Sequence, residues 1–276
     1  MAITAAQVNE LRQRTGAGMM DCKKALEEAQ GDFEKAIDIL RVKGQKIAAK
    51  RADKEAKEGK AYAYVNESGT VGIAFTLNCE TEPVSNTDEF LGLGQMILKA
   101  AIANKPKTVP ELLSLSVDGV NISEKMTELS GKMGEKLEIA KYALIEGEKI
   151  VSYVHANKVA VLVNLIGTNG IDVTEAGKDV AMQIAAMNPV AVDENSVAPE
   201  IIEREKQVGI ERARQEGKPE AVLAKIAEGY VKKFLQENTL LSQTFVKDAK
   251  ISVKQYLESI QKGLTVKSFA RLGVGR

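Results

Sequence analysis

Hydrophobic side chains within residues 1–43 recur at the spacing of helices. Thr4 and Gln7 have the spacing of a capping box that begins the first helix. Gly31 is expected to end the second helix, and Asp32 to cap the third. The apolar positions of the three helices are Val8 and Leu11, then Cys22, Ala25, Leu26 and Ala29, then Phe33, Ala36, Ile37 and Leu40. The pattern therefore predicts a compact three-helix module with a small core.

Residues 44–60 are charged and rich in alanine, and we expect them to continue the third helix before fraying into a linker. The pattern then changes to a period of two, because AYAYV and TVGIAFTLNC flank the turn NESG and predict an antiparallel hairpin. One face of the second strand is expected to carry Val71, Ile73, Phe75, Leu77 and Cys79. A capping box of Asn86 and Glu89 predicts the next helix, and a further helix is expected to begin near Asn121.

The hairpin pattern returns at residues 149–167, where the triplet Tyr-Val-His repeats the Tyr-Val-Asn of residues 64–66. This repetition indicates an internal duplication of two similar α+β subdomains. Residues 197–238 then predict an antiparallel helical hairpin with a narrow apolar seam. The seam is expected to consist of Ile201, Ile202, Val208, Val222, Ile226, Tyr230 and Phe234.

The predicted fold class is therefore α+β. The expected divisions are a module at 1–43, a linker at 44–60, a first core subdomain at 61–138, a second formed by 139–196 with 239–276, and the helical hairpin at 197–238.

The composition excludes several kinds of function. The 38 Lys and Arg residues balance the 38 Asp and Glu residues, whereas proteins that hold nucleic acid through phosphates usually carry a basic surplus. No direct nucleic-acid partner is therefore expected. His155 is the single histidine, so a pair of histidine metal ligands is excluded and little general-base chemistry remains. We expect no catalytic residues, cofactor or metal.

The cysteines and the apolar runs indicate a cellular location. Cys22 and Cys79 fall within apolar patterns, which is typical of buried thiols in a reducing compartment. The beginning of the chain has no apolar segment of a signal peptide, and no uncharged apolar run reaches the roughly 18 residues of a membrane helix. The sequence thus predicts a soluble, cytoplasmic protein without a membrane partner.

A glycine-containing turn, TGAG, precedes the pair Met19 and Met20. It lacks the spacing of a phosphate-binding P-loop and follows a predicted helix instead of a strand. The glycines are therefore expected to shape a tight turn between helices. Two interpretations of the methionines stay open: they belong to the small core, or at least one is an exposed apolar contact for a partner.

The loop after the first hairpin holds Glu80, Glu82 and Asp88. A solvated loop, a cation site and a wedge against a partner are the three interpretations. The acidic residues lack the regular spacing of a calcium loop, which disfavours a cation site.

The stretch ITAAQVNELRQRTGAGMMDCKKALEEAQGDFEKAIDILR closely resembles the N-terminal module of the bacterial elongation factor Ts family. TGAGMMDCKKAL is highly specific for this family, and the similarity continues through both hairpins, the GKP turn, QTFVKD and VKSFARLGVG. It covers essentially the whole chain. The resemblance implies a guanine-nucleotide exchange factor for the GTPase elongation factor Tu, with a UBA-like N-terminal module and a protruding coiled-coil hairpin.

The resemblance also implies which residues contact the GTPase. The family docks through a methionine pair and a following lysine, here Met19, Met20 and Lys23. His155 matches the family's histidine at the tip of the second hairpin, and Val246 falls where the family touches a second domain of its partner.

One loop departs from the family's pattern. The family commonly has Asn-Cys-(Gln or Glu)-Thr-Asp-Phe-Val, whose aspartate and phenylalanine disturb the magnesium side of the partner's nucleotide site. This chain has NCETEPV, so the resemblance assigns the magnesium displacement loop to Thr81, Glu82, Pro83 and Val84. Glutamate keeps the charge, but proline cannot replace an inserted ring. Either a smaller, stiffer wedge acts here, or Phe90 shares its role.

An exchange factor acts by differential binding, because it binds the nucleotide-free GTPase more tightly than the nucleotide-bound form. No covalent step is needed, which suits a chain without recognisable catalytic residues. Two alternatives are a helical adaptor whose N-terminal module binds another protein, and a metal-assisted hydrolase that uses Glu80, Glu82 and Asp88.

Overall fold

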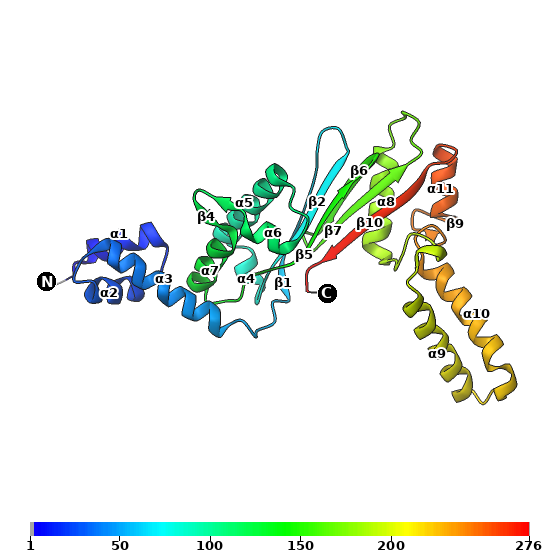
Figure 1. Ribbon diagram of the computed structural model, residues 1–276, viewed down its shortest axis with the longest axis horizontal. Coiled ribbons are helices and arrows are strands. Elements are labelled where there is room, and N and C mark those ends of the chain that lie inside the picture. The colour runs from blue at the N-terminus through cyan, green and yellow to red at the C-terminus, as the bar shows by residue number, and fades with distance from the viewer. Residues whose placement is uncertain (1–2, 276) are drawn as a thin grey trace. The chain divides into compact units, whose positions relative to one another are not determined.

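The computed structural model describes residues 3–275 and has an α+β fold (Figure 1). The chain packs as two compact units. The first contains the chain up to Tyr62, Phe75–Ala143 and the stretch from Leu272, and the second contains Ala63–Ala74 and Leu144–Arg271. This division concerns packing, and the domain boundaries expected from the sequence stay predictions.

Three helices pack together at the start of the first unit, as the hydrophobic spacing predicts: α1 (Ala5–Thr15), α2 (Met19–Glu28) and α3 (Phe33–Lys50). The predicted capping box is present, since the backbone N–H of Gln7 donates to the Thr4 hydroxyl and the Thr4 N–H donates to the Gln7 side chain. Asp32 caps α3. The buried core of this module consists of Val8, Leu11, Cys22, Ala25, Leu26, Ala29 and Ala36.

The first three-stranded sheet has the order β1-β2-β5. The predicted hairpin supplies β1 (Glu58–Val65) and β2 (Val71–Cys79), whereas β5 (Glu138–Glu146) has no clear alternating pattern and was not predicted. Ile73, Phe75, Leu77 and Cys79 of the predicted apolar face are buried, and Val71 is half-buried. Every residue from 72 to 79 is buried, so the opposite face of β2 is covered as well. The rings of Tyr62 and Phe75 stack with centroids 4.8 Å apart.

The helices after β2 include both predicted ones, of which the second begins next to Asn121 as expected and the first begins one residue later than expected. They are α4 (Glu82–Ser85), α5 (Asp88–Asn104), α6 (Val109–Ser114) and α7 (Ile122–Met133), with the small hairpin of β3 (Ser116–Val117) and β4 (Val120–Asn121) before α7. The cap of α5 is Thr87, whose hydroxyl accepts from the Phe90 N–H, so the predicted Asn86 cap is wrong. Asn86 instead ends the one-turn helix α4 and accepts from Lys60.

The second three-stranded sheet has the order β10-β7-β6. The second predicted hairpin forms β6 (Lys149–His155) and β7 (Val159–Ile166), and β10 (Thr265–Gly273) pairs beside β7. Helix α8 (Thr174–Met187) packs against β6 and β7. In both sheets the second hairpin strand lies between the first and a strand from much later in the chain, and this shared order supports an internal duplication.

Helices α9 (Pro199–Gln215) and α10 (Glu220–Asn238) lie side by side as the predicted helical hairpin (Figure 1). The predicted seam is wrong at Val208, Val222 and Ile226, which are 44%, 40% and 36% exposed, whereas its other four residues are half-buried. The side chains buried between the helices are mostly small, which lets the two helices approach closely. These residues are Gly209, Ala213, Leu223 and Ala227.

The remaining elements are η1 (Glu194–Ser196), β8 (Thr244–Phe245), β9 (Asp248–Ser252) and α11 (Val253–Ile260). Within residues 3–275, each helix is too short or too polar to cross a membrane.

Candidate partner-binding site

The turn between α1 and α2 exposes the methionine pair. Gly16 ends α1 with a positive φ of 65°, and Gly18 precedes α2 in an extended conformation. Cys22 then faces the small core, whereas Met19 and Met20 are 59% and 63% exposed. The sequence left open whether the methionines belong to the core or are exposed contacts for a partner. Their exposure supports the second interpretation.

Lys23 follows the methionines on the same exposed part of α2. Its side chain is half exposed, and its ammonium lies 3.9 Å from the carboxylate of Glu27 one turn later. A pair this exposed and this long holds the lysine only weakly, so its charge remains accessible.

The loop that leaves β2 turns at once into the short helix α4. Thr81, Glu82 and Pro83 are exposed, and Val84 is half-buried. Pro83 lies in the first turn of α4, where a backbone N–H would have no partner within the helix. Proline, which lacks this N–H, therefore costs the helix no hydrogen bond. The Ser85 hydroxyl is buried and donates to the Glu82 carbonyl over 2.7 Å. The loop therefore presents a carboxylate and a stiff proline on an ordered backbone.

Glu80 does not join Glu82 and Asp88 in a cation site. One carboxylate oxygen of Glu80 lies 3.0 Å from the Arg51 guanidinium, and the other accepts from the Lys136 N–H over 2.7 Å. No group of three His, Cys, Asp or Glu side chains within residues 3–275 has an arrangement that could hold a metal ion. The geometry thus gives no support to the metal-assisted hydrolase.

Phe90, the aromatic residue nearest the loop, is buried in the core. Its side chain is 0% exposed and lies in the first turn of α5. A fully buried ring cannot insert into a partner without leaving its own core. Its burial disfavours the interpretation in which Phe90 shares the wedge, and the exposed candidates in this loop are Glu82 and Pro83.

The end of α7 approaches both exposed regions of the first unit. Lys132 lies against the Gly16 turn and pairs with Glu89 of α5 over 3.0 Å, and this hydrogen bond lowers the pKa of Glu89. An open cavity of about 420 Å³ lies between these segments. Its lining residues include Met19 and Thr87. The methionine turn and the start of α5 therefore border the same cavity.

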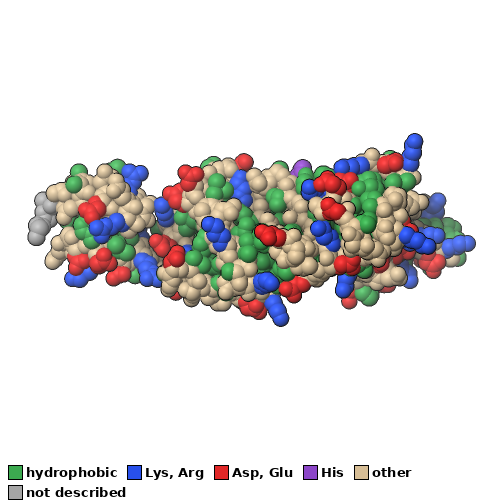
Figure 2. All heavy atoms as spheres, turned by 90° about the horizontal axis from the view of Figure 1, so that it is seen from above, with side chains coloured by type: hydrophobic (Ala, Val, Ile, Leu, Met, Phe, Trp, Pro, Cys, Tyr) green, Lys and Arg blue, Asp and Glu red, His purple; other side chains and the backbone are tan. Residues whose placement is uncertain are grey.

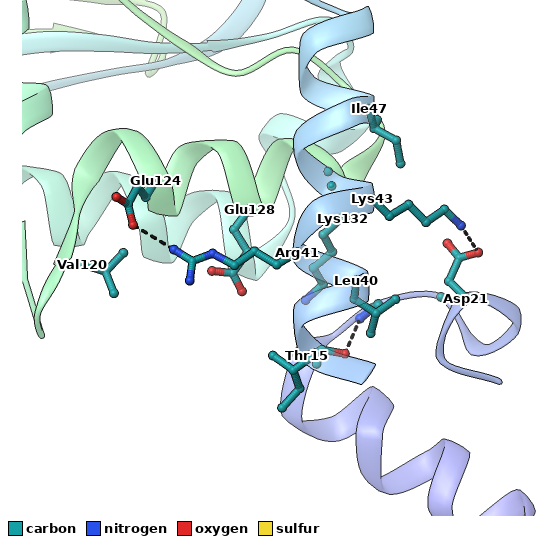
Figure 3. A pocket seen from close by; sticks show the side chains of 15 residues that line it. Thr15, Asp21, Leu40, Arg41, Lys43, Ile47, Val120, Glu124, Glu128 and Lys132 are labelled. Atoms are coloured by element: carbon teal, nitrogen blue, oxygen red, sulfur yellow. Dashed lines mark hydrogen bonds and ion pairs between the residues drawn. The ribbon is translucent and has the colours of Figure 1, made fainter. Parts of the chain in front are cut away.

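A second pocket, of about 220 Å³, lies between α3 and α7 (Figure 3). The two helices cross where a Cβ on Gly131 would overlap the backbone of Gly44. Figure 3 shows Arg41 reaching from α3 toward Glu124 of α7, and the two side chains are 3.0 Å apart. This close crossing joins α3 to the helix that ends beside the loop after β2.

Two further predicted contact residues belong to the second unit. His155 is exposed at the end of β6, and its Nδ1 lies 3.0 Å from the Tyr153 hydroxyl. Val246 is exposed in the turn between β8 and β9, and its N–H donates to the buried Gln183 side chain over 2.8 Å. Both side chains are accessible to a partner.

Charged side chains of both signs are interspersed over the face drawn in Figure 2. This distribution agrees with the equal numbers of acidic and basic residues in the sequence. It is unlike the basic stripe that typically follows a nucleic-acid backbone.

Comparison with known proteins assigns the chain to a family. The family model described as elongation factor TS matches residues 80–276. The chain belongs to the elongation factor Ts family. It is 53% identical to elongation factor Ts of Amoebophilus asiaticus over 276 residues, which is 100% of both chains. The corresponding protein of Cytophaga hutchinsonii is 52% identical over 274 residues, 99% of each chain.

Membership of the elongation factor Ts family makes the chain a translation elongation factor, as the resemblance implied. The match to the relatives extends over the N-terminal module, which precedes the residues that the family model covers. One feature of the candidate site was not found from the sequence. Glu135 contacts the loop after β2 although 54 positions separate it from Thr81.

Proposed function

We propose that this protein is the guanine-nucleotide exchange factor for elongation factor Tu. It binds the GDP-bound GTPase and promotes release of GDP without forming a covalent intermediate. Family membership supports the assignment. The observation that carries it is the exposure of Met19, Met20 and the loop Thr81–Pro83, all presented by an ordered backbone in one compact unit.

The N-terminal module docks on the GTPase domain through Met19, Met20 and Lys23. Methionine side chains are flexible and polarisable, so they adapt to an apolar surface with little strain. Lys23 adds a positive charge beside them. His155 and Val246, in the second unit, make further contacts with the same GTPase. This assignment is supported by the exposure of both side chains.

The loop Thr81, Glu82, Pro83 and Val84 acts on the magnesium side of the nucleotide site. Magnesium neutralises the phosphates of GDP, so a group that disturbs its ligands weakens nucleotide binding. Glu82 supplies the negative charge, and Pro83 supplies a rigid apolar surface directly after it. The two binding equilibria are linked, so a factor that weakens the binding of GDP has its own binding to the GTPase weakened by nucleotide to the same extent. Nucleotide binding therefore allows the factor to dissociate.

Release of a fluorescent GDP analogue from elongation factor Tu, measured with magnesium present, tests this proposal. The wild-type protein should accelerate release. Glu82→Ala should lower the maximal rate about tenfold, which corresponds to roughly 1.4 kcal/mol of lost transition-state stabilisation. Glu258→Ala is a matched control, since Glu258 is an exposed acidic residue of α11 outside the proposed contacts. A release rate that stays at the uncatalysed value with wild-type protein would reject exchange activity and favour the adaptor.

A further inference from the structure

The backbone of the loop after β2 is held by a glutamate from another part of the chain. One carboxylate oxygen of Glu135 accepts from the N–H groups of Glu80 and Thr81 over 3.1 and 3.0 Å. The other accepts from the Thr81 hydroxyl over 2.6 Å. Glu135 itself follows the end of α7, where its carbonyl accepts from the Ser130 hydroxyl over 2.6 Å.

The contact is reciprocal. While Glu135 accepts from the backbone of Glu80, the Glu80 side chain accepts from the backbone N–H of Lys136 and pairs with Arg51. Each of the two segments therefore uses a carboxylate to satisfy N–H groups of the other. Hydrogen bonds to an ionised acceptor are shorter and stronger than those between neutral groups, so this clamp orders the backbone where β2 ends.

We propose that Glu135 is a positioning residue for nucleotide exchange, because it fixes the direction in which Glu82 and Pro83 leave the sheet. This inference rests on the proposed function. Glu82 directly follows Thr81, so rotation of the Thr81 backbone moves the Glu82 carboxylate. Glu135 does not need to touch the GTPase for this role. Its loss lowers the rate at which a bound GTPase releases GDP and has little effect on docking through Met19 and Met20.

The second unit contains a matched control for this experiment. Glu148 accepts from the N–H groups of Gly167 and Thr168 over 3.2 and 2.9 Å and from the Thr168 hydroxyl over 2.6 Å. This is the same set of donors, placed after β7. The residues that follow Thr168 are outside the proposed GTPase contacts. Removal of Glu148 should therefore reproduce the structural loss without the loss of exchange.

The experiment compares Glu135→Ala and Glu148→Ala in the full-length protein. Catalysed release of fluorescent GDP is measured over a range of factor concentrations, which separates kcat from KM. Glu135→Ala should lower kcat about tenfold while KM changes less than threefold, as expected when about 1.4 kcal/mol is lost only in the transition state. Glu148→Ala should keep both values within about twofold of wild type. Glu135→Gln, which keeps one acceptor oxygen, should recover part of kcat.

Amide hydrogen exchange of Thr81, measured without the GTPase, is the second readout. Its protection should fall in Glu135→Ala and persist in Glu148→Ala. Unchanged protection of Thr81 in Glu135→Ala would overturn the clamp. Lost protection with an unchanged kcat, or an equal fall of kcat in both variants, would overturn the positioning role. Failure of the wild-type protein to accelerate release would instead reject the proposed function, and hydrogen exchange would still test the clamp.

Discussion

The connections that leave β2 and β7 use the same support for different continuations. In each, a glutamate from elsewhere accepts from two consecutive N–H groups and a threonine hydroxyl. After β2 the chain forms the helical turn α4, which presents Glu82 and Pro83. After β7 it passes through a turn in which Gly167, Asn169 and Gly170 have positive φ. The two connections therefore share a structural clamp, and they differ in the residues that follow it.

The largest expected effect on stability concerns the buried residue at the start of the helix that follows each connection. Phe90 anchors α5 and is fully buried, whereas the smaller Val173 precedes α8. Phe90→Ala should lower the free energy of unfolding by about 3–5 kcal/mol, because it removes a ring and leaves a cavity. Val173→Ala should cost roughly 1.5–2.5 kcal/mol. Urea denaturation measures both values.

This experiment also separates an anchor from a wedge. If Phe90→Ala unfolds at the same urea concentration as wild type, the ring does not stabilise the core, and the assignment of Phe90 to the core is wrong. If stability falls but catalysed GDP release at a temperature where the variant is folded is retained, the ring is an anchor only. That second outcome is the one expected from its complete burial.

The turn after β7 depends on glycine in a way that the connection after β2 does not. Gly167 has a φ of 78°, and a Cβ there would overlap the carbonyl of Gly263. Gly167→Ala should therefore lower the free energy of unfolding by roughly 2–3 kcal/mol through backbone strain and crowding together.

Gly170→Ala is the matched control for this substitution. Gly170 also has a positive φ, but open space surrounds the position that its Cβ would occupy. Gly170→Ala should lower the free energy of unfolding by about 1 kcal/mol, which corresponds to the backbone strain alone. Thermal or urea unfolding compares the two variants, and equal losses would show that the contact with Gly263 is unimportant.

Local patterns explain which parts of these connections were predictable. The Thr4–Gln7 capping box, the Asp32 cap and both hairpins depend on residues close in sequence, and the structure confirms them. The clamp was missed because Glu135 is 55 residues from Glu80 and nothing in its surrounding pattern marks it. The Asn86 cap was wrong by one residue, since the unpredicted turn of α4 takes up Asn86.

Burial was harder to predict than secondary structure. The helical hairpin lies at its predicted position, but Val208, Val222 and Ile226 of the predicted seam are exposed, and mostly small residues are buried between the helices. Hydrophobic spacing identifies a helix face, whereas the distance between two helices decides which side chains fit between them. The exposure of Met19 and Met20 was undecided for the same reason, because residue type alone does not distinguish a core from a docking surface.

The smallest predicted effect concerns the acid stability of the clamp after β7. Hydrogen bonds from the Thr168 hydroxyl, then from the Thr168 and Gly167 N–H groups, lower the pKa of Glu148 below its ordinary value of 4.5. Because the ionised form is favoured in the folded state, this clamp stabilises the protein above about pH 4.5 and loses its contribution as the pH falls through the folded-state pKa.

The expected result is that the difference in unfolding free energy between wild type and Glu148→Ala is constant near neutral pH and shrinks below pH 4.5. An NMR titration of the Glu148 carboxyl group checks the cause directly. Thr168→Val removes the hydroxyl donor and should move the pKa of Glu148 back toward 4.5. A wild-type carboxyl that titrates at or above 4.5 would show that these donors do not hold its charge in solution. The clamp after β7 would then owe its order to packing, and the resemblance between the two connections would be one of shape alone.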